Sequence, residues 1–352
     1  MQKNYIMPVN FQKNRIVSFD VLRILAAFGV IVIHLAAYGL YEYSQSVEWT
    51  VRNFYHSLFR WVVPIFVMIS GVLFLSVTKQ VDIKKLYVKN ILHITLVYIV
   101  WSIIYVIYDG VGGRNLFEIL QKISSGHFHL WFLKMLIGLY VAVPIMRAVV
   151  LDKKIEKYFI CIAIATATLY PMCLQVMGYL NDSAKLLLAI NYEGLDVHIA
   201  LGYVGYFVLG HYLLTYNISG RIAQAIYVLG AMSVLVVFIL SQWASAYIGG
   251  TYTGFYEYLN LFTMFEASAI FIIINKMKFA SRYHGLLKKV SDATLGIYVV
   301  HVLVMYMVFY YIDFSILYNI ILIPCYAVLI FVISYTIIEI LIRIPIINRV
   351  VK

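Results

Sequence analysis

The sequence predicts an all-α, polytopic transmembrane helical bundle of about ten spans, with both termini in the cytoplasm. Of the 352 residues, 63% are hydrophobic and only 12% are charged, whereas soluble domains carry about 25% charged residues. Long stretches such as 94–107 and 320–338 are almost entirely apolar, while the strands of a membrane barrel would alternate apolar and polar residues. A water-soluble fold and a β-barrel are therefore excluded.

Ten apolar runs are long enough to cross a bilayer, for which an α-helix needs about 20 residues. The runs lie at 16–38, 54–77, 90–108, 130–150, 158–177, 197–216, 222–244, 257–275, 291–310 and 316–340. We therefore expect a single integral-membrane domain over 1–352. Its ten-helix core is expected at 16–340, between cytoplasmic tails at 1–15 and 341–352.

The charged residues predict the orientation of these helices. There are 27 lysines and arginines against 16 aspartates and glutamates, a net charge of +11. If the N-terminus is cytoplasmic, most basic residues fall in cytoplasmic segments, as the positive-inside rule requires. The basic excess therefore indicates a multi-pass protein of the cell (plasma) membrane in contact with membrane lipid. A nucleic-acid partner is not expected.

The first apolar run contains three ionisable residues, which are costly in a membrane and are usually functional. Arg23 and His34 are eleven residues apart, which is three turns at about 3.67 residues per turn, so they share nearly one helix face with Asp20. About 16 Å separates Arg23, toward the cytoplasm, from His34, toward the outside. A structural alternative pairs Asp20 with Arg23 as an anchor and lets His34 hydrogen-bond another helix.

This arrangement suits the transfer of a group from an anionic donor in the cytoplasm to an acceptor on the other side. Coenzyme A thioesters are donors of this kind, and a planar, permanently charged guanidinium binds their phosphates in a bidentate manner. A histidine that titrates near neutral pH can remove the proton of an attacking hydroxyl. Arg23 would hold the donor and His34 would act as the base.

Five motifs follow one another along the chain: SFDVLRILAA at 18–27 with His34 beyond it, VPIFVMISG at 63–71, HLWFL at 129–133, GYFVLG at 205–210 and SDATLGIYVVH at 291–301. In this order they resemble the acyltransferase-3 family of integral-membrane acyltransferases, whose opening helix carries an arginine, ten residues and a histidine.

The resemblance implies a membrane O-acyltransferase with a ten-helix core, an acyl-CoA donor, acetyl-CoA being the expected one, and a carbohydrate hydroxyl as acceptor. The stand-alone members resembled here act on a surface polysaccharide or its lipid-linked precursor and transfer acetyl or succinyl groups. The resemblance also implies that His34 is the catalytic histidine and that Arg23 belongs to the donor or active site. Asp20 would orient Arg23.

One motif departs from the family pattern. Many members carry Arg-x-x-Arg at the start of the third helix, where this chain reads KLYVKNILH at 85–93. Lys89 would supply a phosphate-binding cation there, although a lysine lacks the bidentate fork of arginine.

Three further residues are candidates for substrate binding. His129 and Trp131 lie at the outer end of the fourth run, where they would orient the acceptor beside His34 or simply occupy the membrane interface. His301 lies deep in the ninth run, where it either contributes to the site or makes a structural hydrogen bond. His127 and His129 lack the accompanying ligands of a zinc site, so no metal is expected.

Other functions remain open from the sequence. A polysaccharide or lipid-intermediate transporter would also have many spans and buried charges, but it would favour two related halves with broken helices. A non-catalytic partner in a polysaccharide-synthesis complex would not need Arg23 and His34 on one face. A homo-oligomer is compatible with the sequence. His34 could act as a base in direct transfer or carry the acyl group itself.

Overall fold

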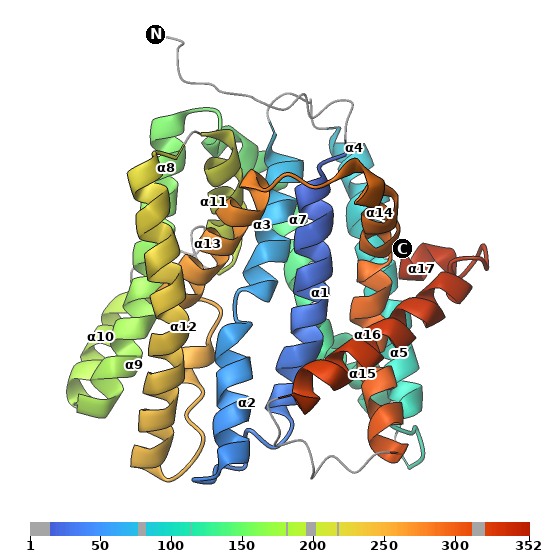
Figure 1. Ribbon diagram of the computed structural model, residues 1–352, viewed down its shortest axis with the longest axis horizontal. Helices are drawn as coiled ribbons and strands as arrows, with labels where there is room; N and C mark the ends of the chain where they lie inside the picture. Colours follow the sequence, from blue (N-terminus) through green and yellow to red (C-terminus); the bar gives the residue numbers. More distant parts are fainter. Residues whose placement is uncertain are drawn as a thin grey trace.

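The computed structural model describes residues 15–76, 82–113, 115–180, 182–194, 202–216, 218–311 and 321–352, and these contain helices and no strand (Figure 1). The first helices are α1 (Val17–Ala37), α2 (Val47–Leu58), α3 (Val62–Leu75), α4 (Ile83–Lys85), η1 (Leu86–Ile91), α5 (Leu92–Tyr108), α6 (Leu116–Ser125), η2 (Phe128–Leu130) and α7 (Trp131–Val149). Next come α8 (Lys153–Ala163), η3 (Ile164–Leu169), α9 (Tyr170–Leu180), α10 (Asp182–Gly194), α11 (Val204–Thr215) and α12 (Gly220–Ile248). The last are η5 (Gly254–Tyr256), α13 (Leu261–Lys276), η6 (Ser281–Tyr283), α14 (His284–Asp292), α15 (Thr294–Tyr311), α16 (Leu322–Leu341) and α17 (Asn348–Val351). The predicted all-α class is confirmed.

The membrane-spanning character of the chain is confirmed as well. Among the described residues, nine helical segments are long and apolar enough to cross a membrane. The shorter helix α11 covers the end of the run predicted at 197–216, and 197–201 lies outside the described residues. The same holds for 316–320 of the last predicted run and for 1–14 of the predicted N-terminal tail.

Helix α1 runs through the middle of the bundle (Figure 1) and contacts α2, α3, α13, α14, α15 and α16. Small residues bring its neighbours close, since Gly29 lies directly against Phe59 and Val62. Close approach through small residues is the usual means of packing helices in a membrane. The helix that carries Arg23 and His34 is therefore enclosed by other helices rather than by lipid.

The second span differs from its predicted form. It was expected as one run at 54–77, but the helical segment begins at Val47 and is broken between α2 and α3. Pro64 lies in the first turn of α3, where it lacks the N–H that would bond to the carbonyl of Arg60 and its ring would clash with that carbonyl. The break places Arg60 inside the bundle.

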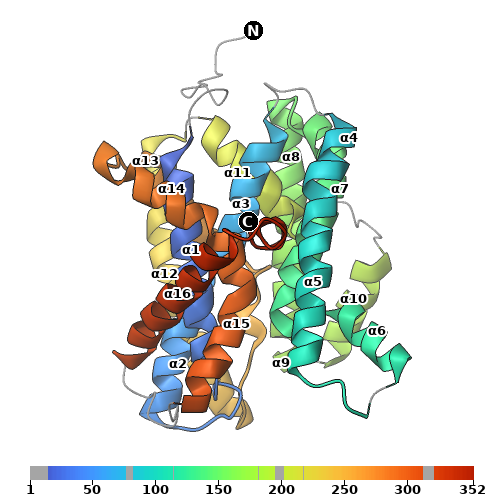
Figure 2. The same ribbon diagram turned by 90° about the vertical axis from the view of Figure 1, so that its right-hand side faces the viewer.

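The C-terminal segment, expected as a cytoplasmic tail at 341–352, packs onto the core. Figure 2 shows the end of the chain beside α15 and α5, and α17 contacts both helices. The indole of Trp101 donates a hydrogen bond of 2.8 Å to the carbonyl of Val350, and Val351 is fully buried. The final residues are thus part of the packed bundle.

Candidate active site

A cavity of about 760 Å³ opens beside the C-terminal half of α1. Most of its wall is aromatic, which suits a ligand with apolar ring faces. The aromatic residues are Tyr38, Tyr41, Phe128, Trp131, Tyr203, Tyr256, Tyr258, Tyr306 and Phe309. The polar lining residues are His34, His56, Arg60, Thr253 and Glu257. Two predicted residues, His34 and Trp131, therefore line the same cavity.

Four histidines from three parts of the chain meet beside this cavity. The rings of His34 and His301 are stacked with their centroids 5.3 Å apart. His129 lies 5.4 Å from His301, ring to ring, and its Nδ1 is 2.9 Å from Nδ1 of His127. The structure thus brings together three predicted site residues, His34, His129 and His301, from α1, η2 and α15.

Backbone contacts hold the inner histidines in place. Nδ1 of His301 lies 2.6 Å from the carbonyl of Tyr298, so Nδ1 carries the proton and Nε2 presents a lone pair. The hydroxyl of Tyr298 donates to the carbonyl of His129. Nε2 of both His301 and His129 is buried without a hydrogen-bond partner, which is costly for a polar atom. Both nitrogens lie behind the cavity wall, since neither His301 nor His129 lines the cavity.

His34 is held by packing rather than by hydrogen bonds. Its ring lies between His301 and Phe128, whose ring centroid is 5.3 Å away. It makes no hydrogen bond to any described residue, and it lines the cavity. A general base must have a nitrogen within reach of its substrate, and the place of His34 on the cavity wall gives it access to a group bound there.

Arg23 lies eleven residues before His34 on the uninterrupted helix α1. Its side chain is partly buried and lies within electrostatic reach of Asp20 and Tyr140. In the described part of the chain it has no hydrogen bond and no ion pair. A buried cation without a partner is costly, so Arg23 is suited to an anionic ligand.

Asp20 is hydrogen-bonded to Arg15 and not to Arg23, although Arg23 lies within its electrostatic reach. Both oxygens of Asp20 accept hydrogen bonds of 2.7 Å from Arg15, and Arg15 also bonds to Asp292 at 2.7 Å. The bond to Asp20 is the main cause of the raised pKa of Arg15. Arg15 captures the carboxylate because its guanidinium engages both oxygens at once. Through Arg15, Asp20 therefore joins α1 to the end of α14.

The two other predicted binding residues differ in their surroundings. Trp131 packs its ring against Tyr203 and Tyr258, with centroids 5.6 and 5.8 Å away, and so forms part of the cavity wall. Lys89 lies in the π-helical turn η1, is exposed and contacts no partner within the described residues. Lys89 is thus outside the histidine site, near the N-terminal end of α5.

Arg60 and His56 were not predicted to belong to the site. Arg60 is only 6% exposed, and its guanidinium lies over the ring of Tyr258, 3.9 Å from the centroid. His56 packs against Tyr256 with ring centroids 4.4 Å apart. The signal that could have identified Arg60 is its place inside the apolar run 54–77, since intramembrane charges are usually functional.

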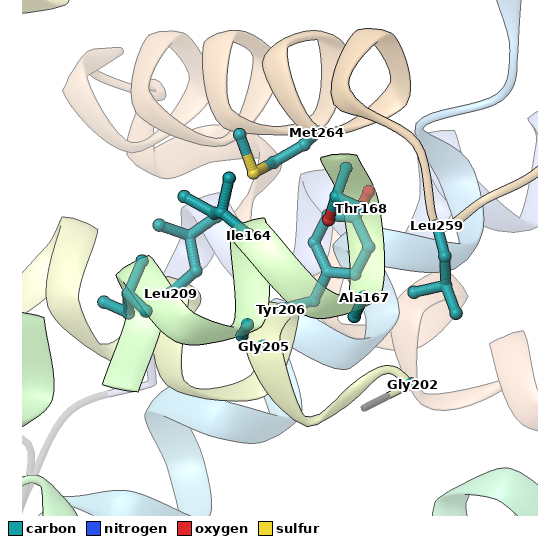
Figure 3. Close-up of a pocket in the computed structure, with 11 residues that line it drawn as sticks. Ile164, Ala167, Thr168, Gly202, Gly205, Tyr206, Leu209, Leu259 and Met264 are labelled. Atoms are coloured by element: carbon teal, nitrogen blue, oxygen red, sulfur yellow. The ribbon is translucent and has the colours of Figure 1, made fainter. Parts of the chain in front are cut away.

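A second cavity is much smaller and lies elsewhere, between α8, η3, α11 and α13 (Figure 3). Its volume is about 20 Å³, enough for about one water molecule. Apart from the hydroxyls of Tyr206 and Thr168 its wall is apolar, and the Tyr206 hydroxyl donates a hydrogen bond of 2.7 Å to the carbonyl of Tyr258. It cannot hold a substrate of the size expected here.

The described residues contain no group of three or more histidine, cysteine, aspartate or glutamate side chains arranged to hold a metal ion. His34 and His301 are stacked face to face, whereas metal ligands converge on one point.

Comparison with known proteins gives one match. A family model described as an acyltransferase domain matches residues 16–339, nearly the whole chain. The match extends from the start of α1 to the last turn of α16. No curated protein and no solved structure matches the chain significantly.

Proposed function

Because the chain belongs to this acyltransferase family and is a multi-pass helical membrane protein, we propose that it moves an acetyl or other short acyl group from acyl-CoA to a sugar hydroxyl. The proposed acceptor is a surface polysaccharide or its lipid-linked precursor, and the proposed membrane is the plasma membrane. Acyl transfer itself follows from the family, whereas donor, acceptor and location are inferred from the site.

One observation carries the proposal. A single helix, α1, presents an unpartnered arginine at one end and, at the other, a histidine that opens on an aromatic cavity. A reaction that joins a highly anionic donor to an uncharged hydroxyl needs these two features, because the donor must be anchored by charge and the hydroxyl must lose its proton. Arg23 and His34 are the residues that supply them.

Arg23 would bind the donor. The positive-inside rule predicts that the N-terminal half of α1 faces the cytoplasm, where coenzyme A thioesters are made. A guanidinium with no protein acceptor has all its donors available for phosphate or carbonyl oxygens. Lys89, exposed at the start of α5, would assist as a second cation for the phosphates.

The cavity would bind the acceptor. Sugar rings stack their C–H faces on aromatic side chains, and Trp131, Tyr203 and Tyr258 form a continuous aromatic wall. Glu257 on the same wall can accept hydrogen bonds from sugar hydroxyls. In this arrangement His34 removes the proton of the attacking hydroxyl, an effect worth about 10²- to 10⁴-fold in rate. His301, stacked on His34, would position it, and His129 packs edge to face against His301.

Acyl transfer in membranes tests the proposal. Membranes that contain the protein and its native acceptor are incubated with radiolabelled acetyl-CoA, and incorporation of label into polysaccharide or lipid-linked sugar is measured. We expect His34→Ala to lower the rate about 10²-fold or more and Arg23→Ala to raise the KM for acetyl-CoA. Lys134→Ala, at the start of α7 and outside the lining of the cavity, is the matched control.

The outcomes are distinguishable. Full transfer by His34→Ala at matched expression would remove the proposed mechanism. Export of sugar without incorporation of label by the wild-type protein would favour a transporter.

A further inference from the structure

We propose that Arg60 is a further catalytic residue, whose guanidinium donates hydrogen bonds to the carbonyl oxygen of the acyl thioester as negative charge develops on it. The inference rests on the proposed function. It starts from the break between α2 and α3, which directs an arginine into the cavity that contains His34.

Arg60 is a buried cation without a directly bonded counter-ion, although Glu266 is within electrostatic reach. Its side chain is 6% exposed, its Nε is fully buried without a partner, and it forms no ion pair with any residue that the structure describes. Its guanidinium lies over the face of Tyr258, 3.9 Å from the ring centroid. Protein interiors rarely leave a cation in this state, because desolvation without compensation is costly. A ligand oxygen in the cavity would complete its hydrogen bonding.

The depth of Arg60 indicates which oxygen this is. Gly29 of α1 lies directly against Phe59 and Val62, the residues on either side of the break, so Arg60 is level with Gly29. Gly29 is five residues before His34, which is about 7.5 Å along the helix axis toward Arg23. Arg60 therefore lies between the proposed donor residue and the proposed base, where the acyl group must pass.

An anionic group on the acceptor is a less suitable ligand for Arg60. The acceptor enters from the mouth of the cavity, whereas the backbone of Arg60 is level with Gly29, one turn and a half before His34, and its side chain is almost fully enclosed. The cavity wall also carries the carboxylate of Glu257, which would repel an anionic sugar. The thioester carbonyl is neutral in the ground state and becomes charged only in the transition state, so a fixed cation stabilises the transition state selectively.

The geometry points to acyl transfer by addition and elimination through a tetrahedral intermediate. His34 takes the proton of the sugar hydroxyl as the hydroxyl oxygen forms a bond to the thioester carbon, and the carbonyl oxygen becomes an oxyanion that accepts hydrogen bonds from Arg60. The oxyanion then re-forms the carbonyl, the carbon–sulfur bond breaks, and the thiolate takes the proton from His34. The products are the sugar ester and free coenzyme A. Arg60 transfers no proton, and its planar face is fixed by Tyr258.

The test compares Arg60→Gln and Arg60→Lys with Arg52→Gln, a change of the same kind on α2 at a residue that does not line the cavity. Transfer from radiolabelled acetyl-CoA is measured in membranes. Inhibition is measured with an acetyl-CoA analogue that carries a trifluoromethyl ketone in place of the thioester, because its hydrate imitates the tetrahedral intermediate.

We expect Arg60→Gln to lower kcat by about 10²- to 10³-fold while the KM for acetyl-CoA stays within about threefold of wild type. The inhibition constant of the analogue should rise by a similar factor to the fall in kcat, and Arg60→Lys should show a smaller loss in both. Arg52→Gln should resemble wild type. If Arg60→Gln does not fold, judged by size-exclusion chromatography in detergent, Arg60→Lys keeps the charge and gives the same comparison.

Two results would overturn the inference. A loss of transfer with unchanged inhibition by the analogue would show that Arg60 acts on the acceptor or on the fold. If Arg60→Gln is as active as Arg52→Gln, Arg60 has no role in acyl transfer. In either case the proposed function is still supported if His34→Ala loses acyl transfer. If His34→Ala keeps full transfer, the proposed function is overturned as well.

Discussion

Replacing Asp20 by asparagine tests whether this carboxylate supports the fold or the donor site. Asp20 is buried and accepts two hydrogen bonds of 2.7 Å from Arg15. Hydrogen bonds to charged groups contribute about 1.5–3 kcal/mol each, less here because Arg15 is partly exposed. Asparagine keeps one acceptor, and Arg15 keeps its bond to Asp292. We therefore expect the free energy of unfolding to fall by about 1–3 kcal/mol.

Thermal unfolding of the purified protein in detergent measures this loss, which should lower the midpoint by about 1–4 °C. The KM for acetyl-CoA is measured in parallel on membranes. It should stay within about threefold of wild type for Asp20→Asn and rise for Arg23→Gln, because Asp20 is bonded to Arg15 and not to Arg23. A rise in KM for Asp20→Asn as large as that for Arg23→Gln would refute the reasoning.

Two further predictions concern packing and pH. A Cβ at position 210 would overlap the backbone of Met68 on α3, so Gly210→Ala should lower the thermal midpoint and cost about 1–3 kcal/mol. Gly138→Ala on α7, where a Cβ meets open space, is its control and should be neutral or slightly stabilising. Burial lowers the pKa of His127. Below about pH 6.5 the unfolded chain therefore binds a proton at His127 that the folded protein does not yet bind. Stability should therefore fall as pH drops below that value, and His127→Gln should reduce the slope of the thermal midpoint against pH; an unchanged slope would contradict this.

The sequence predicted those features of the site that lie on one helix. The spacing of Arg23 and His34 depends only on helical geometry, and α1 is an unbroken helix. The contact of His34 with His301 joins residues on two helices far apart in the chain, and hydropathy carries no information about which helices are neighbours. Motif order indicated that both histidines matter, but their stacking required the structure.

The differences from prediction have a related origin. Asp20 was assigned to Arg23 because the two are three residues apart on one helix. Arg15, which precedes the helix, instead bonds to Asp20 and also to Asp292 on α14. Arg60 was missed because an apolar run predicts a continuous helix. The break depends on a local conflict between Pro64 and the backbone, which a hydropathy window does not detect.

Ion pairing separates the structural charges from the functional ones. Asp20 is paired with Arg15, which also binds Asp292, and Lys289 lies 2.9 Å from Glu339. Glu156 is hydrogen-bonded to His211 at 2.8 Å. Paired charges of this kind stabilise one packing arrangement and leave little capacity for a ligand.

The charges without such pairs are the ones placed at the proposed reaction path. Arg23 and Arg60 have no acceptor among the described residues, and both oxygens of Glu266, which is within electrostatic reach of Arg60, are buried without a hydrogen bond. Removing one member of a buried ion pair destabilises a protein because the other member is left as a buried charge without a partner. A chain that keeps two cations in this state bears that cost in the empty site and recovers it when an anionic donor and its developing oxyanion are bound. The lack of partners is therefore an argument for function at Arg23 and Arg60, and the carboxyl of Glu266 places an acidic group behind Arg60 without neutralising it through a direct bond.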